Sequence, residues 1–99
     1  MTSIDVTEMM KRMQNGEHLN VLDVREKIEY HTYNIGGKNI PLPALKDCLD
    51  EIEWNKMDEI IVICKAGLRS ATAQSILEVN GYQNTRNLTG GLLALQRAQ

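Results

Sequence analysis

The sequence places a cysteine at the end of an apolar run and surrounds it with residues that suit thiol chemistry. In "IIVICKAGLRSATAQSILEVNG", residues 60–81, Cys64 ends the apolar run, and a loop with one glycine and two cations leads into a helical pattern. A free thiol has a pKa of about 8.5, and cations or a helix N-terminus can lower it to roughly 3.5 to 7.5. Cys64 is therefore the candidate nucleophile.

The loop after the thiol is the candidate substrate-binding segment. It consists of Lys65, Ala66, Gly67, Leu68, Arg69 and Ser70. Gly67 permits torsions closed to other residues, so successive N–H groups can point inward as an anion-binding nest. Arg69 would grip an oxyanion with its planar fork, Lys65 would act as a mobile charge at the rim, and Ser70 would cap the next helix. The expected object is a cradle for a small anion with sulfur at its base.

A simpler interpretation of this loop is a buried structural cysteine followed by an ordinary strand-to-helix turn, since free cysteines are often buried. It leaves a glycine and two cations within five residues of the thiol unexplained, which favours catalysis or covalent carriage through sulfur. No second cysteine or histidine lies at ligand spacing from Cys64, so the sequence predicts no metal and no cofactor.

Strand and helix patterns alternate along the chain. Strand patterns cover 19–24, 59–63 and 85–88, with an extended piece at 38–42; helical patterns cover 8–15 after a Thr7 cap, then 26–33, 44–54, 70–80 and 92–99. The β-branched density of 59–63 predicts a central strand buried on both faces, as in parallel sheets. The alternation predicts a doubly wound α/β sheet. Ligands bind outside the carboxyl ends of such strands, where Cys64 falls.

Size and charge restrict the class of protein. Ninety-nine residues with 42% hydrophobic content fit a single domain, residues 1–99. A net charge of -2, with 11 basic and 13 acidic residues, provides no field for nucleic acid or an anionic membrane, so a small-molecule or protein partner is expected. The N-terminus lacks a signal-peptide pattern and no run approaches the roughly 18 apolar residues of a membrane span, which predicts a cytoplasmic location.

Four motifs follow one another in a fixed order along the chain. They are "VLDVRE" at 21–26, "NIPL" at 39–42, "CKAGLRS" at 64–70 and "NLTGGLLAL" at 87–95. Together they resemble the signatures of the rhodanese family of sulfurtransferases over nearly the whole chain. The resemblance implies a three-layer α/β sandwich, in which a five-stranded parallel sheet has helices on both faces.

The resemblance also implies a thiosulfate sulfurtransferase. A donor such as thiosulfate would leave its outer sulfur on Cys64 as a persulfide, and cyanide or a thiol would then remove it. Lys65 and Arg69 would hold the oxyanion of the donor. Asp23 and Arg25 look like ionic braces for the loop, the alternative being a surface pair worth roughly 0 to 1 kcal/mol.

Other functions remain open at this stage. The four residues between Cys64 and Arg69 are similar to a sulfurtransferase loop, whereas phosphatases related by fold have one more, so a phosphatase or arsenate reductase is the weaker interpretation. A persulfide carrier fed by a protein partner and a binding module without chemistry are the alternatives from other classes. The position of Cys48 on the apolar face of a predicted helix indicates core packing. The alternative is that Cys48 is a resolving thiol for Cys64.

The chain departs from the family pattern at three places. Tyr33-Asn34 stands where Gly-His is common, the stretch from Ile35 to Pro41 is one residue shorter, and no aromatic residue follows the final glycine pair. All three lie outside the loop at 64–70. They are therefore expected to alter pocket shape and donor choice more than the thiol.

Overall fold

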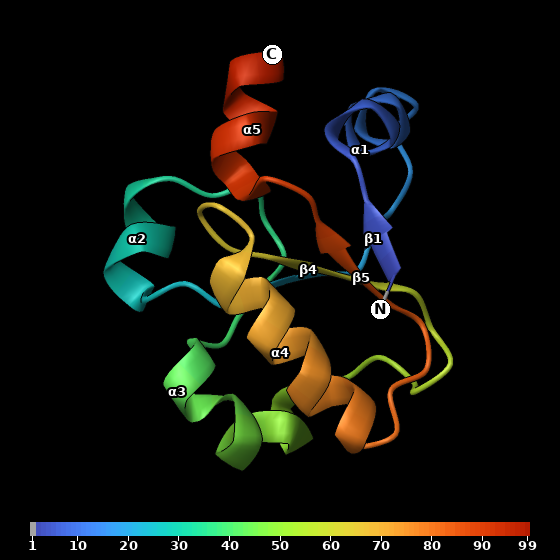
Figure 1. Ribbon diagram of the computed structural model, residues 1–99, viewed down its shortest axis with the longest axis vertical. Helices are drawn as coiled ribbons and strands as arrows, with labels where there is room; N and C mark the ends of the chain where they lie inside the picture. Colours follow the sequence, from blue (N-terminus) through green and yellow to red (C-terminus); the bar gives the residue numbers. More distant parts are fainter. Residues whose placement is uncertain (1) are drawn as a thin grey trace.

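Parallel strands form the centre of the computed structural model, which describes residues 2–99 (Figure 1). The strands are β1 Thr2–Ile4, β2 Val21–Asp23, β3 Lys38–Asn39, β4 Ile60–Ile63 and β5 Thr85–Leu88, in the spatial order β1-β5-β4-β2-β3. The helices are α1 Val6–Gln14, α2 Lys27–Thr32, α3 Leu42–Leu45, the 3-10 helix η1 Lys46–Glu51, α4 Leu68–Val79 and α5 Gly91–Ala98. The predicted five-stranded parallel α/β fold is confirmed.

Strand β4 is the middle of the sheet and is buried on both faces. All four of its residues are fully buried, as the apolar run predicts. Ile60, Val62 and Cys64 belong to the core cluster shared with α3 and α4, whereas Ile61 and Ile63 belong to the cluster shared with α1 and α5. Figure 1 shows these two helix pairs on opposite sides of the sheet. Each buried isoleucine contributes about 1.5 to 3 kcal/mol, so the end of β4 is held firmly.

Two helix caps differ from the sequence predictions. Asp5, not Thr7, caps α1, because its carboxylate accepts the Glu8 N–H at 2.8 Å. Gly67, not Ser70, is the N-cap of α4, with a φ of 99° that suits glycine. Ser70 is instead the third residue of the helix, where its hydroxyl contacts other segments of the chain.

Two further elements were not predicted correctly. The expected helix at 44–54 is the short α3, which begins before Pro43, followed by η1. Apolar residues three positions apart share a face in both helix types, so the pattern could not distinguish them. Strand β1 was missed because it has three residues, of which only Ile4 is buried. None of the helices within residues 2–99 has the length and apolar character needed to cross a membrane.

Adjacent glycines before β3 provide a test of close packing between β2 and β3. Gly36 and Gly37 have similar φ values of 89° and 88°. A Cβ at Gly36 would meet nothing within 4 Å, whereas a Cβ at Gly37 would lie 2.5 Å from the carbonyl oxygen of Val21. Gly36→Ala should cost about 1 to 2 kcal/mol through backbone strain alone. Gly37→Ala should cost about 1 to 3 kcal/mol more, because of the overlap. Urea denaturation measures both, and equal losses would contradict this packing.

Candidate active site

Cys64 lies directly after β4, at the carboxyl edge of the sheet. Strand β4 is flanked by β2 and β5, so the loop at this point is surrounded by the ends of three parallel strands. The Cys64 side chain is buried, with 1% of its surface exposed. Its sulfur forms the floor of the loop that leads into α4.

The loop and the first turn of α4 direct hydrogen-bond donors at the sulfur. The Gly67 N–H donates to Cys64 Sγ at 3.1 Å and the Ser70 N–H at 3.3 Å, while Ser70 Oγ lies 3.3 Å away. Burial raises the pKa of the Cys64 thiol, but the hydroxyl of Ser70 and the N–H groups of Ser70, Gly67 and Ala66 together lower that pKa below the ordinary value. The Ser70 N–H is free to act because the first turn of a helix has no internal partner for it, and the N–H groups of Ala66 and Gly67 belong to the loop before α4. The site therefore stabilises the thiolate of Cys64 relative to that of an unperturbed cysteine.

Asn87 on β5 joins the site through Ser70. The Ser70 hydroxyl is 2.5 Å from Asn87 Oδ1, and Asn87 Nδ2 donates to the Gly67 carbonyl at 3.1 Å. No role for Asn87 was predicted from the sequence. The sequence shows only a polar residue within the strand predicted at 85–88. The structure pairs Asn87 with the buried Val62, and a polar side chain at such a position needs a partner.

The start of α5 holds the loop from the other side. The Leu92 N–H donates to the Cys64 carbonyl and the Leu93 N–H to the Lys65 carbonyl, both at 2.9 Å. A Cβ at Gly91 would lie 2.5 Å from each of those carbonyl oxygens, so only glycine allows this approach. The glycine pair was noted in the sequence as a family motif, but its contact with the cysteine loop was not predicted.

Arg69 is paired with a carboxylate from α2. Its Nη1 and Nη2 donate to Glu29 Oε1 and Oε2 at 2.6 and 3.0 Å. These hydrogen bonds outweigh burial and lower the pKa of Glu29 to about 2, so the carboxylate is ionised at neutral pH. An oxyanion would have to displace Glu29 to use the planar fork of Arg69. Lys65 is exposed, and within residues 2–99 its side chain has no partner.

Asp23 and Arg25 form a buried pair at the end of β2. Arg25 Nε and Nη2 donate to the Asp23 carboxylate at 3.0 and 2.7 Å, and Arg25 Nη2 also donates to the Tyr33 carbonyl at 2.7 Å. The pair is not the surface contact of the simpler interpretation, because both side chains are buried. It secures α2, which in turn presents Glu29 to Arg69.

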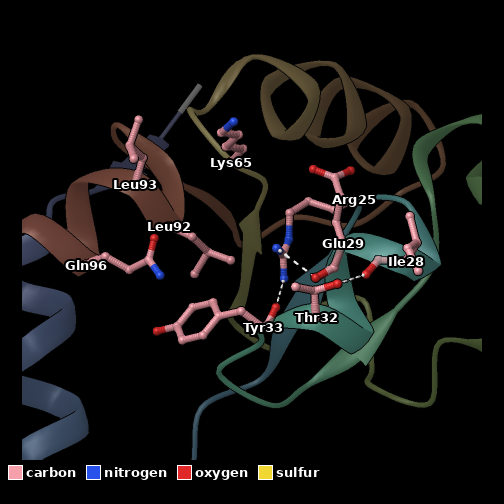
Figure 2. A pocket seen from close by; sticks show the side chains of 9 residues that line it. All are labelled: Arg25, Ile28, Glu29, Thr32, Tyr33, Lys65, Leu92, Leu93 and Gln96. Atoms are coloured by element: carbon pink, nitrogen blue, oxygen red, sulfur yellow. Dashed lines mark hydrogen bonds between the residues drawn. The ribbon is translucent and has the colours of Figure 1, made fainter.

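A pocket of about 330 Å³ lies beside the loop, between α2 and α5. It is lined by Arg25, Ile28, Glu29, Thr32, Tyr33, Lys65, Leu92, Leu93 and Gln96. Figure 2 shows the Tyr33 ring facing the α5 side chains across the pocket, with Lys65 at one end. Tyr33 is one of the departures from the family pattern, and it lies in the wall of this pocket.

Cys48 has the opposite electrostatic environment. A hydrogen bond with Glu51 raises the pKa of its thiol, and burial and the nearby charges of Glu51, Asp50 and Asp47 raise it further. Cys48 is half-buried and packs on the core cluster. These surroundings favour core packing over a resolving thiol. No cluster of three or more His, Cys, Asp or Glu side chains within residues 2–99 is arranged to hold a metal ion.

Comparison with known proteins gives consistent matches. A family model described as a rhodanese-like domain matches residues 5–98. The chain is 33% identical over 90 residues to the putative sulfur carrier protein YrkF of Bacillus subtilis, an alignment that covers 90% of this chain and 48% of that protein. It is 31% identical over 100 residues to a putative mitochondrial thiosulfate sulfurtransferase of Schizosaccharomyces pombe, covering 89% of this chain and 70% of the relative. The chain thus spans about half the length of the Bacillus relative.

Solved structures have the same fold. The protein SSP1007 of Staphylococcus saprophyticus superimposes with a TM-score of 0.84 at 34% identity, covering 96% of this chain and 93% of that one. The human single-domain sulfurtransferase TSTD1 also gives a TM-score of 0.84, covering 100% of this chain and 98% of its own. At 21% identity, the human match shows the fold alone.

The contrast between the two thiols can be measured by pH titration of thiolate absorbance in the ultraviolet. The Cys48→Ser variant retains Cys64 and should titrate at lower pH than free cysteine, because the donors on Sγ stabilise the anion. The Cys64→Ser variant retains Cys48 and should titrate at higher pH than free cysteine. A Cys64 transition at or above that of free cysteine would contradict the description of this site.

Proposed function

Because the chain belongs to the rhodanese-like domain family, we propose that it transfers sulfane sulfur through a persulfide on Cys64. The observation that carries this proposal is the buried Cys64 sulfur, which accepts two backbone N–H groups at the carboxyl end of β4. Relatives named as sulfur carrier and thiosulfate sulfurtransferase support sulfur transfer in general. Thiosulfate as the donor and cyanide or a thiol as the acceptor are the specific proposal.

The first half-reaction loads the cysteine. The Cys64 thiolate attacks the outer sulfur of thiosulfate, the S–S bond of the donor breaks, and sulfite leaves with the bonding electron pair. Cys64 then carries a persulfide whose outer sulfur is negative. The N–H groups of the loop and of the first turn of α4 face the sulfur and stabilise negative charge there.

The second half-reaction unloads the cysteine. Cyanide or a thiolate attacks the outer sulfur, the S–S bond of the persulfide breaks, and its electron pair returns to Cys64 as the thiolate. Cyanide becomes thiocyanate, and a thiol becomes a persulfide. The same N–H groups stabilise Cys64 as a leaving group, so one arrangement serves both halves of a ping-pong cycle.

The cations have unequal roles in this proposal. Lys65 is exposed beside the pocket and attracts the donor anion, whereas the charge of Arg69 is largely offset by its ion pair with Glu29. The buried pair of Asp23 and Arg25 holds α2, and so holds Glu29 in place. We assign these two residues to bracing and not to the reaction.

The length of the loop argues against a phosphatase. Four residues separate Cys64 from Arg69, and the fork of Arg69 already contacts Glu29, which leaves a small cradle for a phosphate ester. A monatomic sulfur on Sγ needs no larger space. Sulfur transfer is therefore the better fit to this geometry.

A protein-fed persulfide carrier is the second candidate. Ile28 on α2 and Leu68 at the start of α4 are 75% and 82% exposed, although both are large and apolar. Ile28 lines the pocket beside Lys65, and Leu68 belongs to the cysteine loop, so a docked protein would cover apolar surface near the thiol. Such a carrier would accept sulfur from a cysteine desulfurase and react slowly with free thiosulfate.

Intact-mass analysis before and after incubation with thiosulfate is the direct test of sulfur loading. The protein should gain the mass of one sulfur atom, located on Cys64 by peptide mapping, and should form thiocyanate when cyanide is added. Cys64→Ser should abolish both results, and Cys48→Ser should leave both intact. Loading by a desulfurase with cysteine, but not by thiosulfate, would select the carrier instead. No added sulfur from either source would refute the proposed function.

Replacement of Lys65 tests electrostatic attraction of the donor. Lys65→Gln should raise the KM for thiosulfate several-fold with a smaller change in kcat, because the lost charge acts on binding of the anion. The increase should shrink as ionic strength rises. Lys11→Gln is the matched control, since Lys11 is also exposed but lies on α1. Its neighbour Arg12 contacts Glu59, which precedes β4, whereas Cys64 follows β4. Equal KM values for the two variants would rule out this role.

A further inference from the structure

The Ser70 hydroxyl lies between Cys64 Sγ and Asn87 Oδ1, and each of these atoms can accept its hydrogen. Its oxygen is 3.3 Å from Cys64 Sγ and 2.5 Å from Asn87 Oδ1. A serine hydroxyl has one hydrogen, so it donates to one of these partners at a time. Whether Cys64 Sγ or Asn87 Oδ1 receives the hydrogen depends on whether Cys64 is protonated.

The orientation of the Asn87 amide is fixed by Gly67. Asn87 Nδ2 lies 3.1 Å from the Gly67 carbonyl oxygen, which can only accept a hydrogen bond. Oδ1 therefore faces Ser70, and because Oδ1 also only accepts, the Ser70 hydroxyl supplies the hydrogen of the 2.5 Å contact. Ser70 Oγ is then an acceptor at Cys64, which suits a protonated thiol that donates its S–H.

Ionisation of Cys64 reverses this arrangement. The S–H is lost, its proton leaves to solvent, and the sulfur becomes a charged acceptor. Hydrogen bonds to charged acceptors are roughly twice as strong as neutral ones, so the Ser70 hydroxyl turns toward the thiolate and Asn87 Oδ1 loses its donor. Asn87 and the thiolate thus compete for one hydrogen.

We infer that Asn87 is a positioning residue that sets the acidity of Cys64 through Ser70, because it holds the hydroxyl hydrogen while the sulfur is a thiol and releases it when the thiolate forms. The effect of this competition on catalysis rests on the proposed function, in which the Cys64 thiolate is both the attacking and the leaving group. Nucleophilicity of a thiolate falls as the pKa of its thiol falls. A competitor that limits the stabilisation of the thiolate therefore preserves its reactivity.

The charged groups on the elements packed around Cys64 stay unchanged in the test. Those at the loop include Lys65, Arg69 on α4 with Glu29 on α2, and Asp23 with Arg25 at the end of β2. On β5, Arg86 pairs with Glu8 and Glu59. The α5 residues that contact the loop, 91–93, carry no charge. A change in acidity caused by uncharged substitutions at positions 70 and 87 therefore reports on hydrogen bonding.

A double-mutant cycle isolates the competition from bracing of the loop. Asn87→Ala removes both the competing acceptor and the donor to Gly67, whereas the same substitution in a Ser70→Ala background removes only the bracing. Thiolate titration in Cys48→Ser protein gives the acid dissociation constant of Cys64 for all four combinations. Asn87→Ala should raise the acid dissociation constant of Cys64 when Ser70 is present. This increase should be about tenfold larger than the change that Asn87→Ala causes in the Ser70→Ala background, a difference of about 1.4 kcal/mol. Equal effects in the two backgrounds would overturn the inference.

Nuclear magnetic resonance of the protein with Asn87 intact provides a second test, in case Asn87→Ala does not fold. The side-chain amide signal of Asn87 should shift through the same pH transition as Cys64, since its oxygen loses a donor there. The shift should disappear in Ser70→Ala. The amide of Asn20, which donates to the Glu59 carbonyl before β4, is the internal control and should stay constant. An Asn87 signal that does not move, or that moves equally without the Ser70 hydroxyl, would overturn the inference.

Both readouts are independent of sulfur transfer. If thiosulfate and a desulfurase leave no sulfur on Cys64 while the cycle shows coupling, the proposed function fails and the role of Asn87 in thiol acidity stands. If sulfur is loaded but the two backgrounds respond equally, the proposed function stands and the role of Asn87 fails.

Discussion

The hydrogen bonds between the first turn of α4 and the sulfur of Cys64 are the interaction on which the rest of the site depends. A buried thiolate is expensive without donors, and two backbone N–H groups are supplied here by Gly67 and Ser70. They can point at the sulfur only because Gly67 has a φ of 99° and starts the helix there.

The other elements around the carboxyl edge hold this contact in place. The N-terminus of α5 donates to the carbonyls of Cys64 and Lys65, so the loop is bonded on its sulfur side and on its backbone side. Helix α2 holds Arg69 through Glu29, and the buried pair of Asp23 and Arg25 holds α2. Three separate parts of the chain thus fix one loop, and each uses hydrogen bonds to charged groups or to backbone atoms.

Local sequence signals were sufficient for most of the framework and for the position of the thiol at the end of β4. The uninterrupted β-branched run predicts β4 because no other element buries so many such residues in succession, and Cys64 follows it directly. The strand at Thr85–Leu88 was also predicted with its observed bounds. The short β1 was not predicted, because three residues are too few to define a strand pattern. The division into α3 and η1 was not predicted either, because a three-residue spacing fits both types of helix.

Long-range partners could not be read from local patterns. Glu26 and Glu29 both occur in one polar helical segment, and only the placement of α2 beside α4 determines that Glu29 meets Arg69. Asn87 likewise gains its role from the pairing of β5 with β4, which brings it to Ser70. Such residues depend on which strands and helices are neighbours in space, so they emerge only once the fold is known.

The contact between α5 and the cysteine loop has a consequence for the order of events during synthesis. Cys64 is synthesised before residues 91–93, so its carbonyl finds its partner only when Leu92 has been added and α5 has formed. Until then the loop between Cys64 and α4 lacks the two backbone hydrogen bonds that Leu92 and Leu93 donate. The backbone of the cysteine loop therefore reaches its final geometry only after a segment made later in synthesis has folded against it.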